Sequence, residues 1–449
     1  MRLLPPAPVS TTPPRHGKAL RFCAGRASVL VGVLWCMVLL SVLVIGILHT
    51  STMNLVIGKN YGDRIQAHYL ALAGIEKAKA LLYQDAKDRR RAGLNHNGQL
   101  YDSEKDFREI KLGRGQFTVF RPARADEGGG VRYGVGDEES RLNLNQAPTN
   151  ELAKIDGMTV DVMGAILDWR DGDNNISPHG AERDYYTSLI PPSFPRNGPF
   201  QTIRELLMVR GVSRDLLFGN SETDTEPLNP GQSALDAGWA SLLTVDSTDQ
   251  NINASGVDRV NVQSSDQSSL TGVKGITTDI ARAIVSYRGQ NQLQSIANLL
   301  DVTAAPPGGR GNQGNNNGPK VISQDLFLDI ADDVTVDNAQ DQQGLVNVNT
   351  ASLEVLICLP GITRELAQAL ISHRQSDGYF ANIGRLLKVP GMTQEIFKQL
   401  APRITARSET FRILSEGKIT GSGVQRRIQV VVHLGSRDID TLSWREDDL

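Results

Sequence analysis

The chain has 449 residues, of which 40% are hydrophobic and 22% charged, and its formal net charge is −3 at pH 7. A chain of this length and apolar content can hold two to four domains with buried cores. The small negative charge excludes a general electrostatic attraction to nucleic acid or to anionic lipid. The three cysteines exclude a disulfide framework, because Cys23 and Cys36 lie in the N-terminal part and only Cys358 lies beyond it. We expect Cys358 to be a buried structural thiol.

An uncharged apolar segment, SVLVGVLWCMVLLSVLVIGIL, covers residues 28–48. As a helix it would span about 30 Å, the thickness of a bilayer core. Arg15, Lys18, Arg21 and Arg26 precede it without any acidic residue. The positive-inside rule therefore predicts a single-pass membrane protein with a cytoplasmic N-terminus and its bulk on the other side. A cleaved secretory signal is disfavoured, because the segment is too long and lacks an A-x-A-like site.

A helix is predicted directly after this segment. Residues 50–87 contain no proline, and Ala67, Ala71, Gly74 and Ala78 recur at helical spacing. Small residues on one face would allow the helix to lie close on a sheet. Alternating apolar residues predict strands at 116–121, 131–135, 411–414 and 427–434. The predicted fold class is α+β, a long N-terminal helix on a small antiparallel sheet, with a large and mainly α-helical insertion between the strands.

The insertion contains three diverged copies of one helical unit. The copies begin at Leu142-Asn-Leu-Asn145, Val260-Asn-Val-Gln263 and Val346-Asn-Val-Asn349. A glycine follows 12 residues after each of these segments, and an arginine follows 13 residues after each glycine. These arginines are Arg170, Arg288 and Arg374. Constant offsets in three copies indicate a true internal repeat.

Five glycines share the pattern glycine–apolar–Ser/Thr–any–acid: Gly157, Gly211, Gly275, Gly361 and Gly391. The pattern predicts a joint between two helices. The glycine takes a positive φ, the hydroxyl caps the second helix, and the acid favours its N-terminus.

This joint resembles the helix-hairpin-helix family, which includes membrane-tethered competence DNA receptors. Members that bind nucleic acid usually have a second glycine, where this chain always has Ser or Thr, followed by a carboxylate. Residues 142–219 carry ten acids and seven bases, which does not suit phosphate. The third copy, with six bases and four acids between residues 345 and 405, is the best candidate for DNA. A structural use of the hairpins is favoured over nucleic-acid binding.

The first copy contains an acidic insert between Arg170 and Phe200. Asp171, Asp173 and Asn175 have the first spacings of an oxygen-ligand calcium loop. At the later EF-hand positions, Ile176 stands where glycine is needed and Glu182 where glutamate is needed, so the pattern is half met. A solvated acidic loop is the alternative. If a cation binds here, carboxylate and amide oxygens favour Ca²⁺ over Zn²⁺. The candidate ligands are Asp168, Asp171, Asp173, Asn175, Glu182 and Asp184.

From about Arg26 onward, the chain resembles the minor pseudopilin K family of type II secretion systems. The resemblance rests on Val33-Leu-Trp35, Leu142-Asn-Leu-Asn145, Asp168-Trp-Arg-Asp171, Gly180-Ala-Glu182 with Asp184-Tyr-Tyr186, and Arg196-Asn-Gly-Pro199. It implies a calcium site in the inserted domain and a leader that prepilin peptidase removes. The family glycine before the cut aligns with Ala27, so cleavage is expected between Ala27 and Ser28, with Gly25 as the second choice. The fifth mature residue would be Gly32, and the family lacks the usual pilin glutamate there.

The resemblance also implies partners and a location. The expected partners are other minor pseudopilins, the major pseudopilin, prepilin peptidase and the inner-membrane secretion platform. The chain would be anchored in the inner membrane with its bulk in the periplasm, cap the tip of the pseudopilus, and promote its assembly for protein secretion. The alternative is a membrane-tethered, extracytoplasmic DNA receptor of the competence type. No enzyme is expected, since the seven histidines form no metal or triad spacing and no hydrolase or P-loop motif occurs.

We expect ten parts in the chain. They are a leader (1–27), a transmembrane helix (28–48), a pilin-type helix with the first strands (49–141), a first copy with the acidic insert (142–219), a connector (220–258), a second copy (259–302), a Gly/Asn/Pro-rich linker (303–320), a third copy that pairs two helix-hairpin-helix turns (345–405), closing strands (406–434) and a polar tail (435–449). The folds of the copies are expected to be SAM-like.

Overall fold

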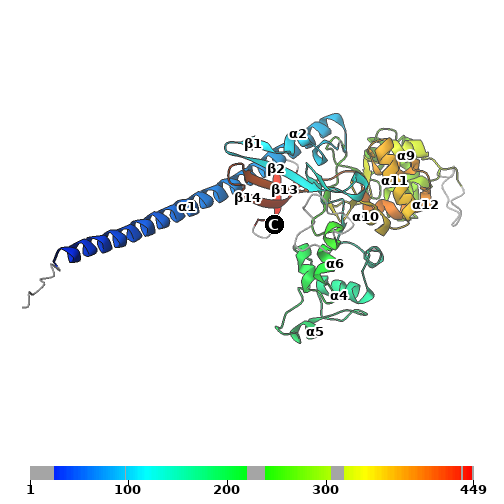
Figure 1. The fold of residues 1–449 in the computed structure, drawn as a ribbon. Helices are drawn as coiled ribbons and strands as arrows, with labels where there is room; N and C mark the ends of the chain where they lie inside the picture. The colour runs from blue at the N-terminus through cyan, green and yellow to red at the C-terminus, as the bar shows by residue number, and fades with distance from the viewer. Residues whose placement is uncertain (1–24, 97, 220–237, 305–317, 436–437, 447–449) are drawn as a thin grey trace, which may run out of the picture. The chain divides into compact units, whose positions relative to one another are not determined.

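The computed structural model describes residues 25–96, 98–219, 238–304, 318–435 and 438–446 (Figure 1). The predicted leader thus lies almost wholly outside the described residues, as do parts of the connector and the linker. The chain divides into two compact units, residues 1–62 and 63–449, and each is considered by itself.

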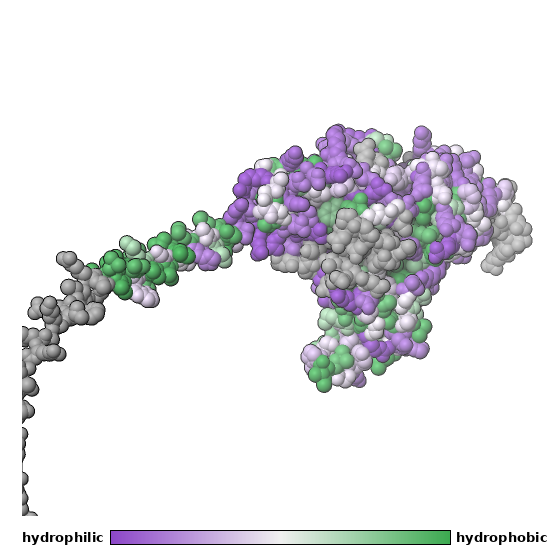
Figure 2. All heavy atoms as spheres, in the orientation of Figure 1, coloured by the Kyte–Doolittle hydropathy of each residue, from purple (hydrophilic) through white to green (hydrophobic). Residues whose placement is uncertain are grey.

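The first unit contains the N-terminal part of helix α1 (Gly25–Ala92). All large apolar side chains between Val29 and Ile57 are exposed, and Figure 2 shows the hydrophobic residues along this part of the helix. Among the described residues, α1 alone is long and apolar enough to cross a membrane. The predicted transmembrane segment is therefore part of a longer continuous helix.

The second unit contains a seven-stranded antiparallel sheet on which the rest of α1 packs. Its strands are β1 (Ile110–Leu112), β2 (Gly115–Pro122), β13 (Thr410–Ile419), β14 (Gln425–Leu434) and β15 (Ile439–Arg445), in that spatial order, with β3 (Val131–Arg132) beside β2 and β4 (Gly136–Asp137) beside β13. Strands from both ends of the second unit's sequence meet in the pairing of β2 with β13. The α+β class with a large insertion is confirmed.

Small residues allow α1 to approach the sheet closely. A Cβ atom at Gly417 in β13 would overlap the carbonyl oxygen of Ala67, and one at Gly74 in α1 would overlap the Ser415 hydroxyl. Ala71 and Ala78 are completely buried on the same face of the helix. The small-faced helix predicted from the sequence therefore packs on the sheet as expected.

The prediction of a polar tail at residues 435–449 is wrong for the central part of this segment. Residues 439–445 form β15, which pairs with β14 and extends the sheet. Val432 pairs with Thr441 and Val431 with Ser443, so Leu442 is an extra residue in a bulge. The bulge breaks the alternation of side chains, which explains why no strand pattern is visible in the sequence.

In each copy of the insertion, the first strand and the last strand pair with each other in parallel. The pairs are β5 (Leu142–Asn143) with β6 (Leu243–Thr244), β8 (Val260–Asn261) with β9 (Val334–Thr335), and β11 (Val346–Asn347) with β12 (Ile404–Thr405). The three copies thus extend over 142–244, 260–335 and 346–405. A further antiparallel pair, β7 (Thr248–Gln250) with β10 (Asp341–Gln343), joins the segments between the copies.

Short helices fill each copy. The first contains α3 (Thr149–Leu152), α4 (Val160–Arg170), α5 (Arg183–Thr187), η3 (Ile203–Met208), α6 (Arg214–Phe218) and η5 (Trp239–Ser241). The second contains α7 (Gln267–Thr271), α8 (Thr278–Arg288), η6 (Ile296–Asp301) and α9 (Gln324–Ile330). The third contains α10 (Leu353–Cys358), α11 (Arg364–Ser376), η7 (Ile383–Lys388), α12 (Gln394–Leu400) and η8 (Ala401–Arg403). Near the sheet lie η1 (Gln99–Tyr101), α2 (Glu104–Phe107) and η2 (Ala125–Glu127).

The first two copies are longer than the sequence analysis predicts. The second copy does not end at residue 302, because α9 and β9 complete it. Ser323 caps α9 as Thr393 caps α12, but Val321 stands where the other turns have glycine. Because this glycine is missing, the second turn of the copy cannot be recognised from the glycine pattern.

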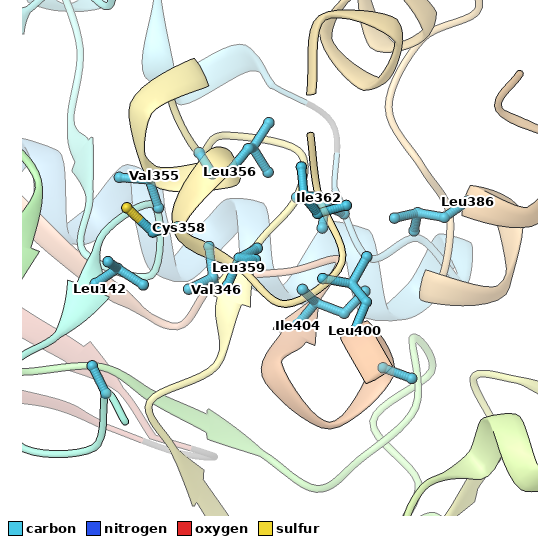
Figure 3. Close-up of a cluster of buried hydrophobic side chains, with 14 of the residues drawn as sticks. Leu142, Val346, Val355, Leu356, Cys358, Leu359, Ile362, Leu386, Leu400 and Ile404 are labelled. Atoms are coloured by element: carbon cyan, nitrogen blue, oxygen red, sulfur yellow. The ribbon is translucent and has the colours of Figure 1, made fainter. Parts of the chain in front are cut away.

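One hydrophobic core connects the three copies. It includes Leu142 of the first copy, Leu270 of the second and Leu359 of the third, all completely buried. Figure 3 shows Leu142 in one cluster with Val346, Val355 and other residues of the third copy. The insertion is therefore packed as one body.

Candidate functional site

All five glycine turns have the predicted geometry. The φ angles are 76° at Gly157, 83° at Gly211, 98° at Gly275, 73° at Gly361 and 87° at Gly391. The hydroxyl that follows each glycine accepts a hydrogen bond from a backbone N–H in the first turn of the next helix; these hydroxyls belong to Thr159, Ser213, Thr277, Thr363 and Thr393. The turns thus stabilise helix starts from within the protein.

The repeated polar residues fasten the parts of each copy together. Asn349 donates to the carbonyl oxygen of Phe380 at 3.0 Å and accepts from its N–H at 2.7 Å. Asn145 makes the same two bonds with Phe200 at 3.0 and 2.7 Å. In the second copy, Gln263 accepts from the N–H of Leu293 at 3.0 Å. These bonds give the repeated polar position a structural role.

The repeated arginines have a similar role. Arg374 donates to the carbonyl oxygens of Val348 and Ala351 at 3.1 and 2.8 Å. Arg288 donates to the carbonyl oxygen of Val262 at 2.8 Å. In the first copy, the carbonyl acceptors of the Arg170 guanidinium are Leu144 and Ala147. Each arginine therefore holds the loop after the opening strand, instead of facing a ligand.

The basic residues of the third copy are largely engaged within the protein. Four of its six bases form ion pairs with acids outside the copy: Arg374 with Asp126, Arg385 with Asp329, Lys398 with Asp301 and Arg403 with Glu151. Because phosphate binding needs cationic groups that face solvent, this pairing argues against a nucleic-acid surface on the third copy.

Three acids of the first copy converge as a candidate metal centre. Asp168, in α4, and Glu182, just before α5, are buried, and Asp171 is half-buried directly after α4. Each offers an oxygen, and these three atoms lie within 4.8 Å of one another. The loop from Asp171 to Ala181 returns the chain to α4, and this return brings Glu182 to the end of that helix.

Four of the carboxylate oxygens of these three acids lack a hydrogen-bond partner among the described residues. Asp168 Oδ2, Asp171 Oδ1 and both carboxylate oxygens of Glu182 are buried without a hydrogen bond. Burial and the neighbouring carboxylate of Asp168 raise the pKa of Glu182, and burial raises the pKa of Asp171, with repulsion from Asp173 and Asp168 adding to it. Buried carboxylates without partners are costly unless a cation neutralises them, so the site fits a hard divalent cation.

The other three predicted ligands lie outside this group. Asp173, Asn175 and Asp184 are exposed. The Asp173 carboxylate accepts from the backbone N–H of Asn175 at 2.7 Å, so it stabilises a turn of the loop. Of the residues at EF-hand positions, Asp171 and Glu182 join the group and Asp173 and Asn175 do not, while Asp168, which precedes the loop, joins it through the fold.

Asn197 was not identified as a site residue from the sequence. Its amide donates to the carbonyl oxygen of Asp173 and, at 3.0 Å, to the side chain of Asn174, and its own oxygen is buried without a hydrogen bond among the described residues. Its φ of 47° is unusual for a residue other than glycine. The signal that could have found it is its place in the Arg196-Asn-Gly-Pro199 segment of the family resemblance.

A second acidic cluster joins the insertion to the sheet, and no sequence pattern predicts it. The Glu139 carboxylate accepts from the backbone N–H groups of Glu409 and Thr410. The Arg407 guanidinium donates to Asp249 at 2.6 Å. Burial raises the pKa of Glu139 well above its usual range and that of Glu409 to about 7. Protein groups donate to the carboxylates of Glu139, Asp249 and Glu409, which indicates a structural junction.

The single cysteine of the second unit is buried at the end of α10. Burial raises the pKa of the Cys358 thiol to about 12, so it stays protonated and inert. This agrees with the structural thiol predicted from the sequence.

Two family models match parts of the insertion. Residues 150–218 match protein K of the type II secretion system (T2SS), and residues 341–405 match the helix-hairpin-helix motif. Among solved structures, the chain is similar to one in the crystal structure of the GspK-GspI-GspJ complex from the type 2 secretion system of enterotoxigenic Escherichia coli. The match has 14% identity and a TM-score of 0.42, and it covers 86% of this chain and 98% of that chain.

Curated relatives match shorter stretches. ComE operon protein 1 of Bacillus subtilis (strain 168) is 36% identical over 63 residues, which are 14% of this chain and 31% of that protein. Endonuclease/exonuclease/phosphatase family domain-containing protein 1 of Mus musculus is 22% identical over 197 residues, 41% of this chain and 34% of that protein. The chain therefore spans about a third of the length of these relatives.

The long helix, the divided sheet and the glycine turns define an α+β protein with helix-hairpin-helix turns in its insertion. Within that class, residues 150–218 relate the chain to type II secretion system protein K, and the resemblance drawn from the sequence is confirmed.

Proposed function

We propose that the chain is a minor pseudopilin that caps the tip of a type II secretion pseudopilus and promotes its assembly for secretion across the outer membrane. The observation that carries the proposal is the protein K match at residues 150–218, which lies inside an insertion that divides the pilin-type sheet. The role is that of an assembly component and not of an enzyme, in keeping with this family match.

The apolar part of α1 supports a role in a helical stem. Its large apolar side chains between Val29 and Ile57 are exposed, so they need a bilayer or other apolar helices around them. We propose an inner-membrane anchor with a cytoplasmic N-terminus before assembly. Other minor pseudopilins, the major pseudopilin and the secretion platform would be its partners.

The proposed tip position has a steric basis. The described residues between 142 and 405 form a packed body between strands of one sheet, and a pilin-type subunit with such an insertion leaves little room for a further subunit above it. Gly32 would stand at the fifth position after cleavage behind Ala27, where it provides no carboxylate for a following subunit.

The position can be tested by gold labelling of an epitope on the insertion in sheared pseudopili. We expect label at one end of each filament and fewer filaments when the chain is deleted. Label distributed along the filaments would contradict the capping role.

Processing gives a second test. We propose that prepilin peptidase cuts after Ala27, with Gly25 as the alternative. Intact-mass analysis of the protein purified from membranes should show the loss of residues 1–27 or 1–25. An uncut N-terminus in cells with active peptidase would refute the pilin route.

We also propose that the acidic centre binds Ca²⁺ through Asp168, Asp171 and Glu182. The support is the set of buried oxygens without partners among the described residues. The bound cation would neutralise the negative charges of the three neighbouring carboxylates. Isothermal titration of the calcium-stripped protein should detect one site, which Asp171→Asn removes.

A DNA receptor of the competence type is the second candidate. It is supported by the helix-hairpin-helix match at residues 341–405 and by the likeness to ComE operon protein 1. It requires binding of the protein to fluorescent duplex DNA that weakens as salt rises. Absence of binding at low salt would remove this candidate.

A further inference from the structure

Beside the acidic centre lies an uncharged segment, here called the loop 185–195, which includes the last three residues of α5 and the loop after it. Residues 185–195 read YYTSLIPPSFP and contain no charged side chain. The side chain of Ile190 is 97% exposed and that of Phe194 60% exposed. Figure 2 shows hydrophobic residues on the surface of this copy, around α5. Because these apolar side chains are exposed, the loop gains little stability from burial, and other contacts must hold it in one conformation.

The start of the loop is fastened to residues next to the acidic centre. Tyr186 is completely buried, and its ring packs edge-to-face against Trp169 at 5.3 Å. Trp169 directly follows Asp168, and its indole N–H donates to Glu205 at 3.1 Å. Glu182 directly precedes α5, the helix that contains Tyr186. Two of the three acids are thus connected to the loop through a buried aromatic pair.

The far end of the loop returns to the same helix. The backbone N–H of Ser193 donates to the carbonyl oxygen of Tyr186 at 3.0 Å. The guanidinium of Arg183 lies over the ring of Phe194 at 5.6 Å. Both contacts start from α5, so the position of α5 fixes both ends of the loop.

The position of α5 in turn depends on Glu182. Its two oxygens and Asp168 Oδ2 are buried and have no partner among the described residues, although the acids lie close to one another. Without a cation, like charges at this separation repel, and Glu182 is the member that can move because a loop precedes it. Movement of Glu182 would shift α5 and release both fastenings of the loop.

We infer that a divalent cation at Asp168, Asp171 and Glu182 orders the loop 185–195 and so holds Ile190 and Phe194 in one arrangement. The inference rests on the proposed calcium site, and it adds that the site controls a segment whose side chains do not touch the cation. Filled and empty sites then differ in the surface that the first copy presents.

Hydrogen exchange followed by mass spectrometry on the full chain in detergent tests this inference. The calcium-stripped protein is compared with the protein in CaCl₂ and in MgCl₂. We expect the amides of residues 187–190, 193 and 194 to exchange about tenfold more slowly in CaCl₂. The amides of α6 in the same copy should change little, because α6 contains none of the three acids.

Two variants complete the design. Asp171→Asn should abolish the calcium-dependent protection of the loop, while Asp184→Asn, an exposed acid in the first turn of α5, should keep it. Isothermal titration on the same samples shows whether calcium binds at all, and so distinguishes failure of the calcium site from failure of its control over the loop. Lack of calcium binding refutes the site itself. Binding that protects only residues 168–182, or protects α6 as strongly as the loop, refutes control of the loop.

Discussion

Gly180 leaves the space that the Asp168 carboxylate occupies. A Cβ atom at this position would overlap Asp168 Oδ2, one of the oxygens without a partner among the described residues. Glycine is therefore required here for the packing of the acidic centre, although its φ is not in the left-handed region. Gly172, in the same loop, has no described atom within 4 Å of the place that a Cβ atom would take.

This difference gives a prediction at the scale of single residues. Gly180→Ala should displace Asp168 and abolish most of the rise in melting temperature that CaCl₂ produces. Gly172→Ala should retain that rise, because its methyl group points into open space. Differential scanning fluorimetry with and without calcium measures both. Equal calcium responses of the two variants would contradict the role of Asp168.

At the scale of elements, the third copy depends on Arg374. Its side chain is buried, holds two carbonyl oxygens and pairs with Asp126 at 2.9 Å. Arg374→Ala should destabilise the protein by about 3 kcal/mol, since it removes the ion pair with Asp126 and the donor of two carbonyl groups. Arg288→Ala, which removes one such bond at a half-buried position, should cost about 1 kcal/mol.

The comparison can be made by urea denaturation monitored by circular dichroism. A larger loss of stability for Arg288→Ala than for Arg374→Ala would show that the repeated arginines do not act through these carbonyl groups. An unchanged midpoint for Arg374→Ala would show the same.

Sequence reasoning succeeded where the structure depends on neighbouring residues. A glycine, a hydroxyl and an acid within five consecutive positions determine a helical joint, so the five turns could be predicted from the local chain alone. The same reasoning failed for α9, because Val321 replaces the glycine. It also failed for β15, where the bulge at Leu442 removes the alternation that identifies a strand.

The acidic centre was predictable only in part. Asp168, Asp171 and Glu182 were among the candidates, but spacing within the loop favoured Asp173 and Asn175 equally. Glu182 belongs to the acidic centre, and its exposed neighbour Asp184 does not, only because the chain returns to α4 at Glu182. The junction of Glu139, Asp249 and Glu409 could not be predicted, because its acids are brought together by strands far apart in the sequence.

At the scale of the whole second unit, Glu409 connects the insertion, the sheet and α1. It accepts from the N–H of Gln250 at 2.7 Å, and the Arg90 guanidinium lies 3.7 Å from its carboxylate. Burial raises the pKa of Glu409 from 4.5 to about 7, against the opposing effect of Arg407. The folded protein thus holds a proton that the unfolded chain releases between these two pH values.

The consequence is a dependence of stability on pH. The contribution of Glu409 is fully present below about pH 4.5 and is lost as pH rises through about 7, a change of about 3 kcal/mol. Glu409→Gln should remove this part of the decline, since the amide keeps the bond to Gln250 and cannot ionise. Melting temperatures at pH 5, 6, 7 and 8 provide the measurement.

The matched control is Glu104→Gln on the exposed surface of α2, which should leave the pH profile as it is in the unchanged protein. A profile of Glu409→Gln identical to that of the unchanged protein would show that other groups cause the decline.

The parallel pairs that open and close each copy have an evolutionary consequence. Val260 lies beside Val334, and Val346 beside Ile404, so a whole copy enters and leaves the body at adjacent points. A chain built in this way can gain, lose or enlarge a copy without moving the strands on either side. Duplication of one such closed unit is therefore a simple route to an insertion of three copies.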